Sequence, residues 1–130
     1  MIRFYSTKNK NTLFTLEEAV FKGLAPDGGL FMPAQIPSID LNKIISRSFV
    51  ELSFEVAKTL LNQAIPENDL RNIVEKSITF DAPLVALSDS LYSLELFHGP
   101  TLSFKDFGAR FMAQLMSYLN RNLNRELHIL

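Results

Sequence analysis

The sequence contains no cysteine and no tryptophan, shows no marked excess of either charge, and has no long apolar run. Without cysteine, disulfide frameworks and thiolate chemistry are excluded. A formal net charge of -1 offers little attraction to nucleic acid phosphates or to an anionic membrane surface, so we expect neither as a partner. No stretch approaches the roughly 20 apolar residues that a membrane-spanning helix requires.

Metal ligands and targeting signals are also scarce. The two histidines, His98 and His128, are not spaced like metal ligands, and we expect no metal site. Residues 1–12 lack the apolar core of a signal peptide. By exclusion, we expect a cytoplasmic protein.

The composition supplies enough apolar material for a packed core. The chain has 130 residues, the size of one ordinary domain, and 47% of them are hydrophobic while 21% are charged. Such a composition is typical of a globular chain and not of a disordered one. Phenylalanine is frequent, with 11 residues, and we assign most of these rings to core packing.

The first half of the chain predicts short strands, turns and one capped helix. Thr15 and Glu18 have the spacing of a capping box, and Gly23 is the usual residue for the left-handed position after a helix. The expected elements are a strand at 2–7, a polar turn at 8–11, a helix at 16–22, a turn at 25–29 and an extended piece at 30–32.

The second half predicts amphipathic helices and a strand hairpin. The expected elements are helices at 41–46, 49–64, 66–78 and 104–120, and strands at 83–87, 92–97 and 126–130. A strand, a helix and a further strand form the β-α-β pattern of a parallel sheet. We therefore predict an α/β fold, with an N-terminal region at 1–80 and, at 81–130, the opening β-α-β unit of a larger, incomplete α/β domain.

The main candidate for chemistry is Lys105, at the junction of a loop with an amphipathic helix. A helix start and burial both disfavour the ammonium form, which favours a nucleophilic amine. Ser103 is expected to cap this helix, and Asp106 to complete the cap while opposing that effect by its charge. The competing interpretation is a solvated lysine paired with Asp106, and for a surface lysine it is the more common outcome.

Other candidates have simpler structural explanations. His98 is expected to satisfy loop backbone groups, and Gly28-Gly29 lacks the spacing of a phosphate-binding motif and predicts only a turn. Four further cations are expected to be solvated charges and not anion ligands: Arg3, Lys8, Lys22 and Arg110. The residues alone therefore predict an α/β protein with one candidate lysine.

Two motifs resemble a known family. The segment that contains Lys105, LELFHGPTLSFKDFGARFMAQL, is similar to the region around the cofactor lysine of the threonine synthases. These are pyridoxal-phosphate enzymes of the tryptophan-synthase-β-like fold. Upstream, GLAPDGGLFMP at 23–33 resembles the family's N-terminal signature, and Phe4–Thr7 resembles its usual start. The resemblance extends over essentially all 130 residues.

The resemblance implies an activity and a set of site residues. The family converts O-phospho-L-homoserine and water to L-threonine and phosphate, a carbon-oxygen lyase reaction of threonine biosynthesis. Lys105 matches the lysine that forms the Schiff base with pyridoxal 5'-phosphate and then moves protons as base and acid. Ser103, Phe104 and Asp106 are expected beside the cofactor, and Thr101 beside the substrate.

The resemblance also implies that parts of the site are missing. In the family, the glycine-rich loop that holds the cofactor phosphate and the group that contacts the pyridine nitrogen both follow the position of Leu130. We therefore expect an N-terminal fragment that is inactive by itself, holds the cofactor weakly and self-associates through uncovered apolar surface. Two alternatives stay open: another lyase or dehydratase of the same fold type, and a non-catalytic assembly module.

Overall fold

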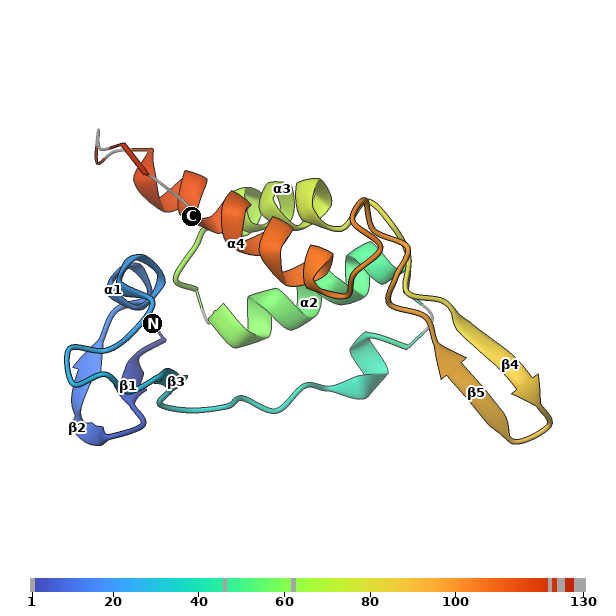
Figure 1. Cartoon of the computed structure of the whole chain (residues 1–130), viewed down its shortest axis with the longest axis horizontal. Coiled ribbons are helices and arrows are strands. Elements are labelled where there is room, and N and C mark those ends of the chain that lie inside the picture. Colours follow the sequence, from blue (N-terminus) through green and yellow to red (C-terminus); the bar gives the residue numbers. More distant parts are fainter. Residues whose placement is uncertain (1, 46, 62, 122, 124–125, 128–130) are drawn as a thin grey trace.

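The structure, a computed structural model, describes residues 2–45, 47–61, 63–121, 123 and 126–127. A small sheet lies at one end, helices α2, α3 and α4 form the middle, and a hairpin projects at the other end (Figure 1). The elements are β1 (Phe4–Ser6), β2 (Asn9–Phe14), α1 (Leu16–Lys22), β3 (Phe31–Pro33), a 3₁₀ helix η1 (Leu41–Lys43), α2 (Phe49–Leu61), α3 (Glu67–Ser77), β4 (Leu84–Ser88), β5 (Leu91–Leu94) and α4 (Lys105–Asn120). The predicted mixed α/β class is confirmed. Within the described residues, no helix has the length and apolarity to cross a membrane.

The small sheet is antiparallel, with β1 between β2 and β3. Tyr5 pairs with Leu13 on one side and with Met32 on the other. The polar turn predicted at 8–11 is wrong in its extent, because β2 begins at Asn9. Only the last residue of β2 is buried, so this edge strand carries no alternation of apolar and polar residues from which a strand is predicted.

The start and end of α1 follow the sequence signals. The backbone N–H of Glu18 donates to Thr15 Oγ1 at 3.2 Å, and the N–H of Thr15 donates to Glu18 Oε2 at 2.8 Å. The predicted capping box is therefore confirmed. Gly23 ends the helix with a φ of +67°, which a residue without a Cβ adopts at low cost.

A buried hydroxyl fastens the turn at 25–29 to β1. Ser6 Oγ donates to Asp27 Oδ1 at 2.6 Å, and the N–H of Gly29 donates to the same oxygen at 2.9 Å. A Cβ on Gly29 would overlap Ser6 Oγ, so this position requires glycine. We call this arrangement the Ser6–Asp27 pair; the hydrogen bond from Ser6 is the main reason that the pKa of Asp27 lies below its ordinary value.

Helices α2 and α3 begin close to the predicted positions but with different capping contacts. The N–H of Glu51 donates to Ser48 Oγ at 3.3 Å, whereas the Glu51 carboxylate pairs with Arg71 of α3 at 2.7 Å and so does not complete a capping box. The guanidinium of Arg71 also lies 4.1 Å from the ring centroid of Phe54. Helix α2 ends at Leu61, earlier than predicted, and Pro66 precedes α3 as its N-cap.

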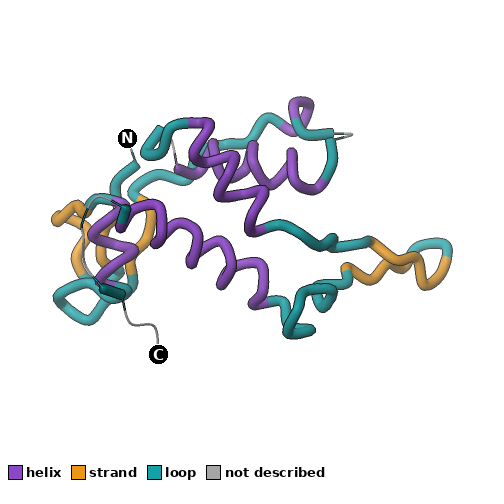
Figure 2. Tube along the Cα trace, turned by 90° about the horizontal axis from the view of Figure 1, so that it is seen from above, coloured by secondary structure: helices purple, strands orange, loops and turns teal. Residues whose placement is uncertain are grey.

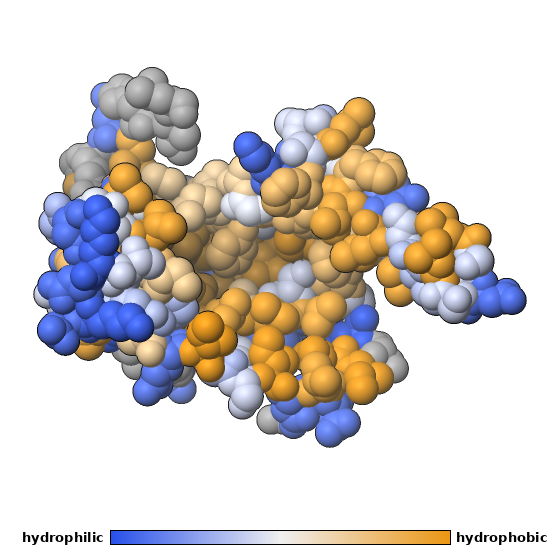
Figure 3. Space-filling view, turned by 60° about the horizontal axis from the view of Figure 1, so that its bottom comes forward, coloured by the Kyte–Doolittle hydropathy of each residue, from blue (hydrophilic) through white to orange (hydrophobic). Residues whose placement is uncertain are grey.

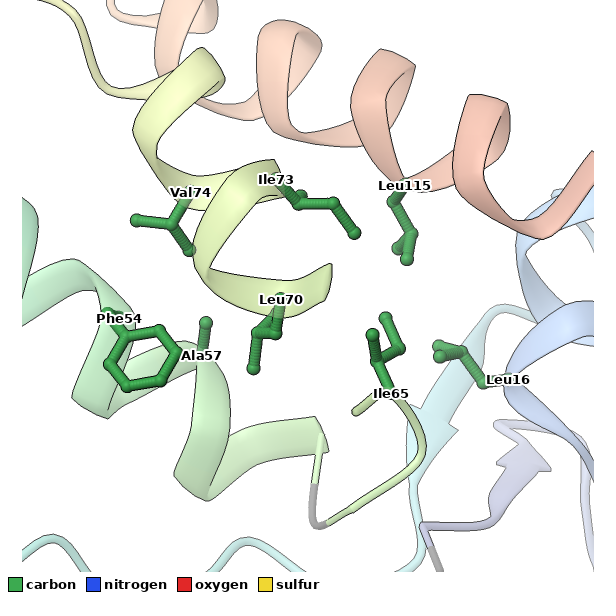
Figure 4. Close-up of a cluster of buried hydrophobic side chains, with 8 residues drawn as sticks. All are labelled: Leu16, Phe54, Ala57, Ile65, Leu70, Ile73, Val74 and Leu115. Carbon is green, nitrogen blue, oxygen red and sulfur yellow. The ribbon is translucent and has the colours of Figure 1, made fainter. Parts of the chain in front are cut away.

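One apolar cluster joins all four helices. Figure 4 shows its side chains, which come from α1, α2, α3, α4 and the segment before α3: Leu16, Phe54, Ala57, Ile65, Leu70, Ile73, Val74 and Leu115. The α4 residue Leu115 makes this core continuous across the predicted boundary between 1–80 and 81–130. Leu115 packs α4 onto the cluster that includes three side chains of α3, and this contact holds the helix that follows the loop. Figure 2 shows the helices and the projecting hairpin from above.

Arg110 adds a polar contact between α4 and the end of α3. Its Nε donates to the carbonyl of Ser77 at 2.9 Å, and its Nη2 donates to the carbonyl of Lys76 at 3.0 Å and to Thr79 Oγ1 at 3.1 Å. Carbonyls in the last turn of a helix have no partner within the helix, so a guanidinium satisfies them. The expectation of a solvated charge at Arg110 is therefore wrong, because its guanidinium is bound by the end of α3 and the residues that follow it.

The predicted hairpin is present, with β4 antiparallel to β5 and a turn at Asp89-Ser90. The strands pair Leu84 with Leu94. No parallel strand pair occurs among the described residues. Of the strand predicted at 126–130, Glu126 and Leu127 are not in a strand, and residues 128–130 lie outside the described part.

Replacing Leu70 by alanine tests the core. Leu70 is 2% exposed in the shared cluster, and the change should lower the free energy of unfolding by about 2–5 kcal/mol, since it removes apolar contacts and leaves a cavity. Leu41→Ala is the matched control, because Leu41 is 65% exposed and its loss should change stability by less than about 0.5 kcal/mol. Urea denaturation followed by circular dichroism measures both, and equal effects of the two substitutions would contradict this core.

Candidate functional site

The loop that leads from β5 to α4 carries the residues predicted to be functional. Its first part is held to the hairpin, since the N–H of Glu95 donates to the carbonyl of Pro83 at 2.9 Å. The Glu95 carboxylate also lies 2.7 Å from His98 Nε2, and the His98 ring stacks on Phe97 with centroids 4.8 Å apart. His98 therefore contacts a side-chain carboxylate, and the sequence prediction that it satisfies loop backbone groups missed this partner.

The centre of the loop is organised by a buried carboxylate. Asp106 is only 6% exposed, and its Oδ2 accepts from the N–H of Thr101 at 2.8 Å while its Oδ1 accepts from Thr101 Oγ1 at 2.6 Å. We call this the Thr101–Asp106 pair. Its hydrogen bonds join Thr101 in the loop to the second residue of α4. Lys105 therefore lies within a segment, residues 101–106, whose two ends are hydrogen-bonded to each other; we call it the closed segment.

Two backbone features depend on the Thr101–Asp106 pair. A Cβ on Gly99 would lie 2.6 Å from the Cβ of Asp106, which leaves room only for glycine. Leu102 has a φ of +56°, in the left-handed region that bulky residues rarely enter, at a cost of about 1–3 kcal/mol. Its N–H donates to the carbonyl of Gly99 at 3.0 Å. Such strain persists only where the surroundings hold the backbone on both sides.

The start of α4 differs from the predicted cap. The N-cap position is taken by Phe104, which makes no side-chain capping bond, and not by Ser103. Ser103 Oγ accepts from the N–H of Lys105 at 3.3 Å, so it still supports the first turn. Asp106 does not complete a capping box, because its carboxylate is directed back to Thr101.

Lys105 is the first residue of α4, and its side chain is exposed. Burial, one of the two effects expected to favour the neutral amine of Lys105, is therefore not seen at this residue. Phe104 is 65% exposed, whereas Phe107 turns inward, with its ring centroid 4.7 Å from that of Phe80. The expected ion pair with Asp106 is also absent from the described part of the chain. Lys105 is therefore a solvated amine on a rigid backbone.

The electrostatics of the loop concentrate on Asp106. The hydrogen bond from the Thr101 side chain, the backbone bonds from Thr101 and Ser103, and the charge of Arg110 all hold the pKa of Asp106 below its ordinary value, whereas burial opposes them. Asp106 is thus ionised at neutral pH. An ionised acceptor strengthens both bonds that it receives from Thr101.

The other candidate from the sequence, the turn at Gly28-Gly29, has no free N–H groups for a phosphate. The N–H of Gly28 donates to the carbonyl of Ala25 at 2.8 Å, and that of Gly29 to Asp27. The turn is structural, as predicted. Within the residues that the structure describes, no group of acidic or histidine side chains is arranged to hold a metal ion.

The chemistry of the loop fits the covalent attachment of pyridoxal phosphate. Attachment requires an accessible amine, and Lys105 is exposed at the end of a loop whose backbone is fixed by hydrogen bonds. A phosphate cradle requires several unpaired N–H groups, and the glycine turn of this chain does not offer them. The described residues therefore fit the covalent link and leave the phosphate contact unassigned.

Solved structures identify the class of protein to which this fold and loop belong. The chain matches the crystal structure of threonine synthase from Escherichia coli with a TM-score of 0.85 and 36% identity, over 90% of this chain and 28% of that one. It matches the pyridoxal-phosphate-bound threonine synthase from Brucella melitensis with a TM-score of 0.88 and 30% identity, over 97% of this chain and 29% of that one. The fold is that of the N-terminal portion of these pyridoxal-phosphate enzymes.

Sequence relatives give the family. A family model for the threonine synthase N terminus matches residues 3–78, and the chain belongs to the threonine synthase family. It is 40% identical to the Haemophilus influenzae threonine synthase over 117 residues, or 89% of this chain and 28% of that protein. It is 38% identical to the Saccharomyces cerevisiae enzyme over 127 residues, or 87% of this chain and 25% of that protein. The chain thus spans about a quarter of the length of these relatives.

A pair of glycine substitutions tests the geometry of the loop. Gly99→Ala should lower the free energy of unfolding by about 1–3 kcal/mol, because the new Cβ meets the Cβ of Asp106. Gly108→Ala is the control within α4, where a Cβ meets nothing within 4 Å, and it should raise stability by roughly 0.5–1 kcal/mol. Thermal denaturation measures both, and a stabilising Gly99→Ala would contradict the contact.

The pH dependence of stability tests Asp106. Its native pKa is below the ordinary 3.8, so its contribution is complete above that value and is lost as the pH falls through the native pKa. The difference in free energy of unfolding between wild type and Asp106→Asn should therefore be constant from about pH 5 to 8 and shrink below about pH 4. Urea titrations across this range measure it. The pKa values of Asp27 and Glu18 are also lowered, but both residues are present in both proteins, so their contributions cancel in the difference. A difference in free energy of unfolding that is the same at pH 2 as at pH 7 would contradict the lowered pKa of Asp106.

Proposed function

We propose that these 130 residues form the N-terminal part of a threonine synthase, with pyridoxal 5'-phosphate attached to Lys105. That enzyme converts O-phospho-L-homoserine and water to L-threonine and phosphate. The observation that carries the proposal is the exposed amine of Lys105 on the first residue of α4, at the end of a hydrogen-bonded loop, in a chain of this family.

The roles of the residues follow from their positions. Pyridoxal phosphate, when bound, withdraws electrons from the substrate carbon next to the nitrogen. Lys105 Nζ holds the cofactor and, once released from it, takes and returns protons on the substrate. Because Lys105 is exposed, its side chain can contact groups outside these 130 residues. Its flexible side chain also lets Nζ move between two carbon atoms of the substrate. Ser103 and Phe104 adjoin Lys105 and are proposed to border the cofactor.

The proposed division of the chain is 1–80 as the N-terminal region of a threonine synthase and 81–130 as the start of the cofactor-binding domain. A family model that ends at residue 78 supports it. We propose a cytoplasmic location, in keeping with the biosynthetic role proposed above. A different lyase or dehydratase of this fold type is less well supported. The family model for the threonine synthase N terminus matches residues 3–78, and the segment at 23–33 within this range resembles the threonine synthases in particular.

Weak cofactor binding and self-association of the isolated chain stay predictions. Apolar side chains gather on the projecting hairpin, at the right of Figure 3, and around a hollow in that face. The exposed large hydrophobic residues of the hairpin are Leu84, Val85, Leu87, Leu91, Tyr92 and Leu94. Apolar surface of this kind supports the self-association proposed for this chain.

A chimera tests the proposed function. In it, the 130 residues replace the matching N-terminal part of the Escherichia coli relative, whose fold agrees with a TM-score of 0.85. The purified chimera should release phosphate from O-phospho-L-homoserine, form threonine and show the absorbance of a lysine-bound cofactor. Lys105→Ala should abolish both signals, because the amine is lost.

Lys76→Ala is the matched control, since Lys76 is an exposed lysine in the last turn of α3 and lies outside the segment from Glu95 to Asp106. It should leave threonine formation and absorbance unchanged. Reduction with borohydride followed by peptide mass spectrometry should place the cofactor on Lys105 alone. Threonine formation that survives Lys105→Ala, or a reduced adduct on another lysine, would overturn the proposal.

A further inference from the structure

We infer that Thr101 and Asp106 are positioning residues, which fix the backbone that carries Lys105 and touch neither cofactor nor substrate. The inference rests on the proposed function, since it concerns how the amine of Lys105 is placed. It gives these two residues a role different from the cofactor and substrate contacts that the family resemblance implied.

The hydrogen bonds of the Thr101–Asp106 pair occupy both carboxylate oxygens. Oδ2 accepts from the backbone N–H of Thr101 and Oδ1 from its hydroxyl, at 2.8 and 2.6 Å. Asp106 is 6% exposed, and the neighbouring Gly99 leaves no space on that side. Because Asp106 is almost fully buried and each of its oxygens already accepts from the loop, little of its carboxylate is open to a ligand at the exposed Lys105.

The closed segment from Thr101 to Asp106 restricts the Cα of Lys105. One end is held by the pair, and the first turn of α4 is supported by the bond from the Lys105 N–H to Ser103 Oγ at 3.3 Å. Leu102, with its φ of +56° and 75% exposure, has no buried side chain to hold it. The pair, together with the bond from the Leu102 N–H to the carbonyl of Gly99, therefore keeps this strained residue in place.

Placement matters because the amine itself is free. Lys105 is exposed, and no described side chain holds its Nζ. Only the position of its Cα is set by this chain, and a misplacement of 1 Å at a reacting group costs up to about 100-fold in rate. Because hydrogen bonds order the loop before the cofactor binds, less conformational entropy is lost on binding.

The chain contains a matched control in the Ser6–Asp27 pair. There, too, a hydroxyl donates to an aspartate at 2.6 Å, a backbone N–H donates to the same carboxylate, and a glycine has no room for a Cβ. This pair lies in the N-terminal sheet and turn, distant from the start of α4, which carries Lys105 (Figure 1). Loss of its hydroxyl disturbs stability in the same way without touching the loop of Lys105.

The first experiment compares Thr101→Val, Thr101→Ser and Ser6→Ala in the active chimera. Thr101→Val removes the hydroxyl bond to Asp106 and should lower kcat for threonine formation about 10- to 100-fold, with KM for O-phospho-L-homoserine within about 2-fold. Thr101→Ser keeps both bonds and should restore kcat to within about 2-fold. Ser6→Ala should lower the melting temperature while kcat stays unchanged.

The pattern of outcomes separates the two proposals. A rise in KM with kcat unchanged in Thr101→Val would mean direct substrate contact and would overturn the positioning role, as would an unchanged kcat. Lys105→Ala in the same chimera reports on the proposed function alone. If Lys105→Ala abolishes activity and Thr101→Val does not alter it, the proposed function stands and the positioning role fails.

A second measurement uses the 130-residue chain itself and needs no activity. The amide hydrogens of Thr101 and Lys105 should exchange slowly in wild type and at least about 10-fold faster in Asp106→Asn. In Asp27→Asn their rates should be unchanged, while the N–H of Gly29 should exchange faster. Rapid exchange of the Thr101 amide in wild type would overturn the inference whatever the chimera shows.

Discussion

The packing of α4 against α3 is the interaction on which the rest of the structure depends. Leu115 brings α4 into the cluster built by α1, α2 and α3, and Arg110 fixes its other face to the end of α3. Without this contact the loop before α4 would have no fixed base. The position of Lys105, at the first residue of the same helix, is therefore a consequence of core packing and not only of local sequence.

The chain uses the same chemical device twice, at the two places where irregular backbone must hold one shape. In each, an aspartate accepts from a hydroxyl and from a backbone N–H, beside a glycine that leaves no room for a Cβ. Asp106 is buried in its pair, whereas in the other pair Ser6 is buried and Asp27 is exposed. A loop cannot satisfy its polar groups through a helix or a sheet, so side-chain acceptors replace them. In the Ser6–Asp27 pair these hydrogen bonds hold a turn against a strand, and in the Thr101–Asp106 pair they hold the segment that carries Lys105.

At the candidate site the backbone is held by hydrogen bonds, whereas the side chain of Lys105 is exposed. The chain supplies a rigid backbone and an amine that is open to its surroundings, as covalent attachment of a cofactor requires. The first turn of α4 also exposes Phe104, and the adjacent loop exposes Leu102. A family whose members are about four times as long, with structures that hold pyridoxal phosphate, is consistent with an amine that reaches beyond this segment.

The sequence by itself determined the elements whose signals are local. The capping box of Thr15 and Glu18, the positive φ of Gly23 and the hairpin of β4 and β5 all depend on residues within a few positions of one another. The motif around Lys105 is local too, and it makes Lys105 the candidate cofactor lysine. The tertiary structure decided what depends on distant partners: β2 is an edge strand without alternation, Glu51 turns to Arg71, and the aspartate after Lys105 turns from the expected helix cap to Thr101. A side chain with several acceptors near it takes the one that the fold presents, and sequence spacing does not show which one that is.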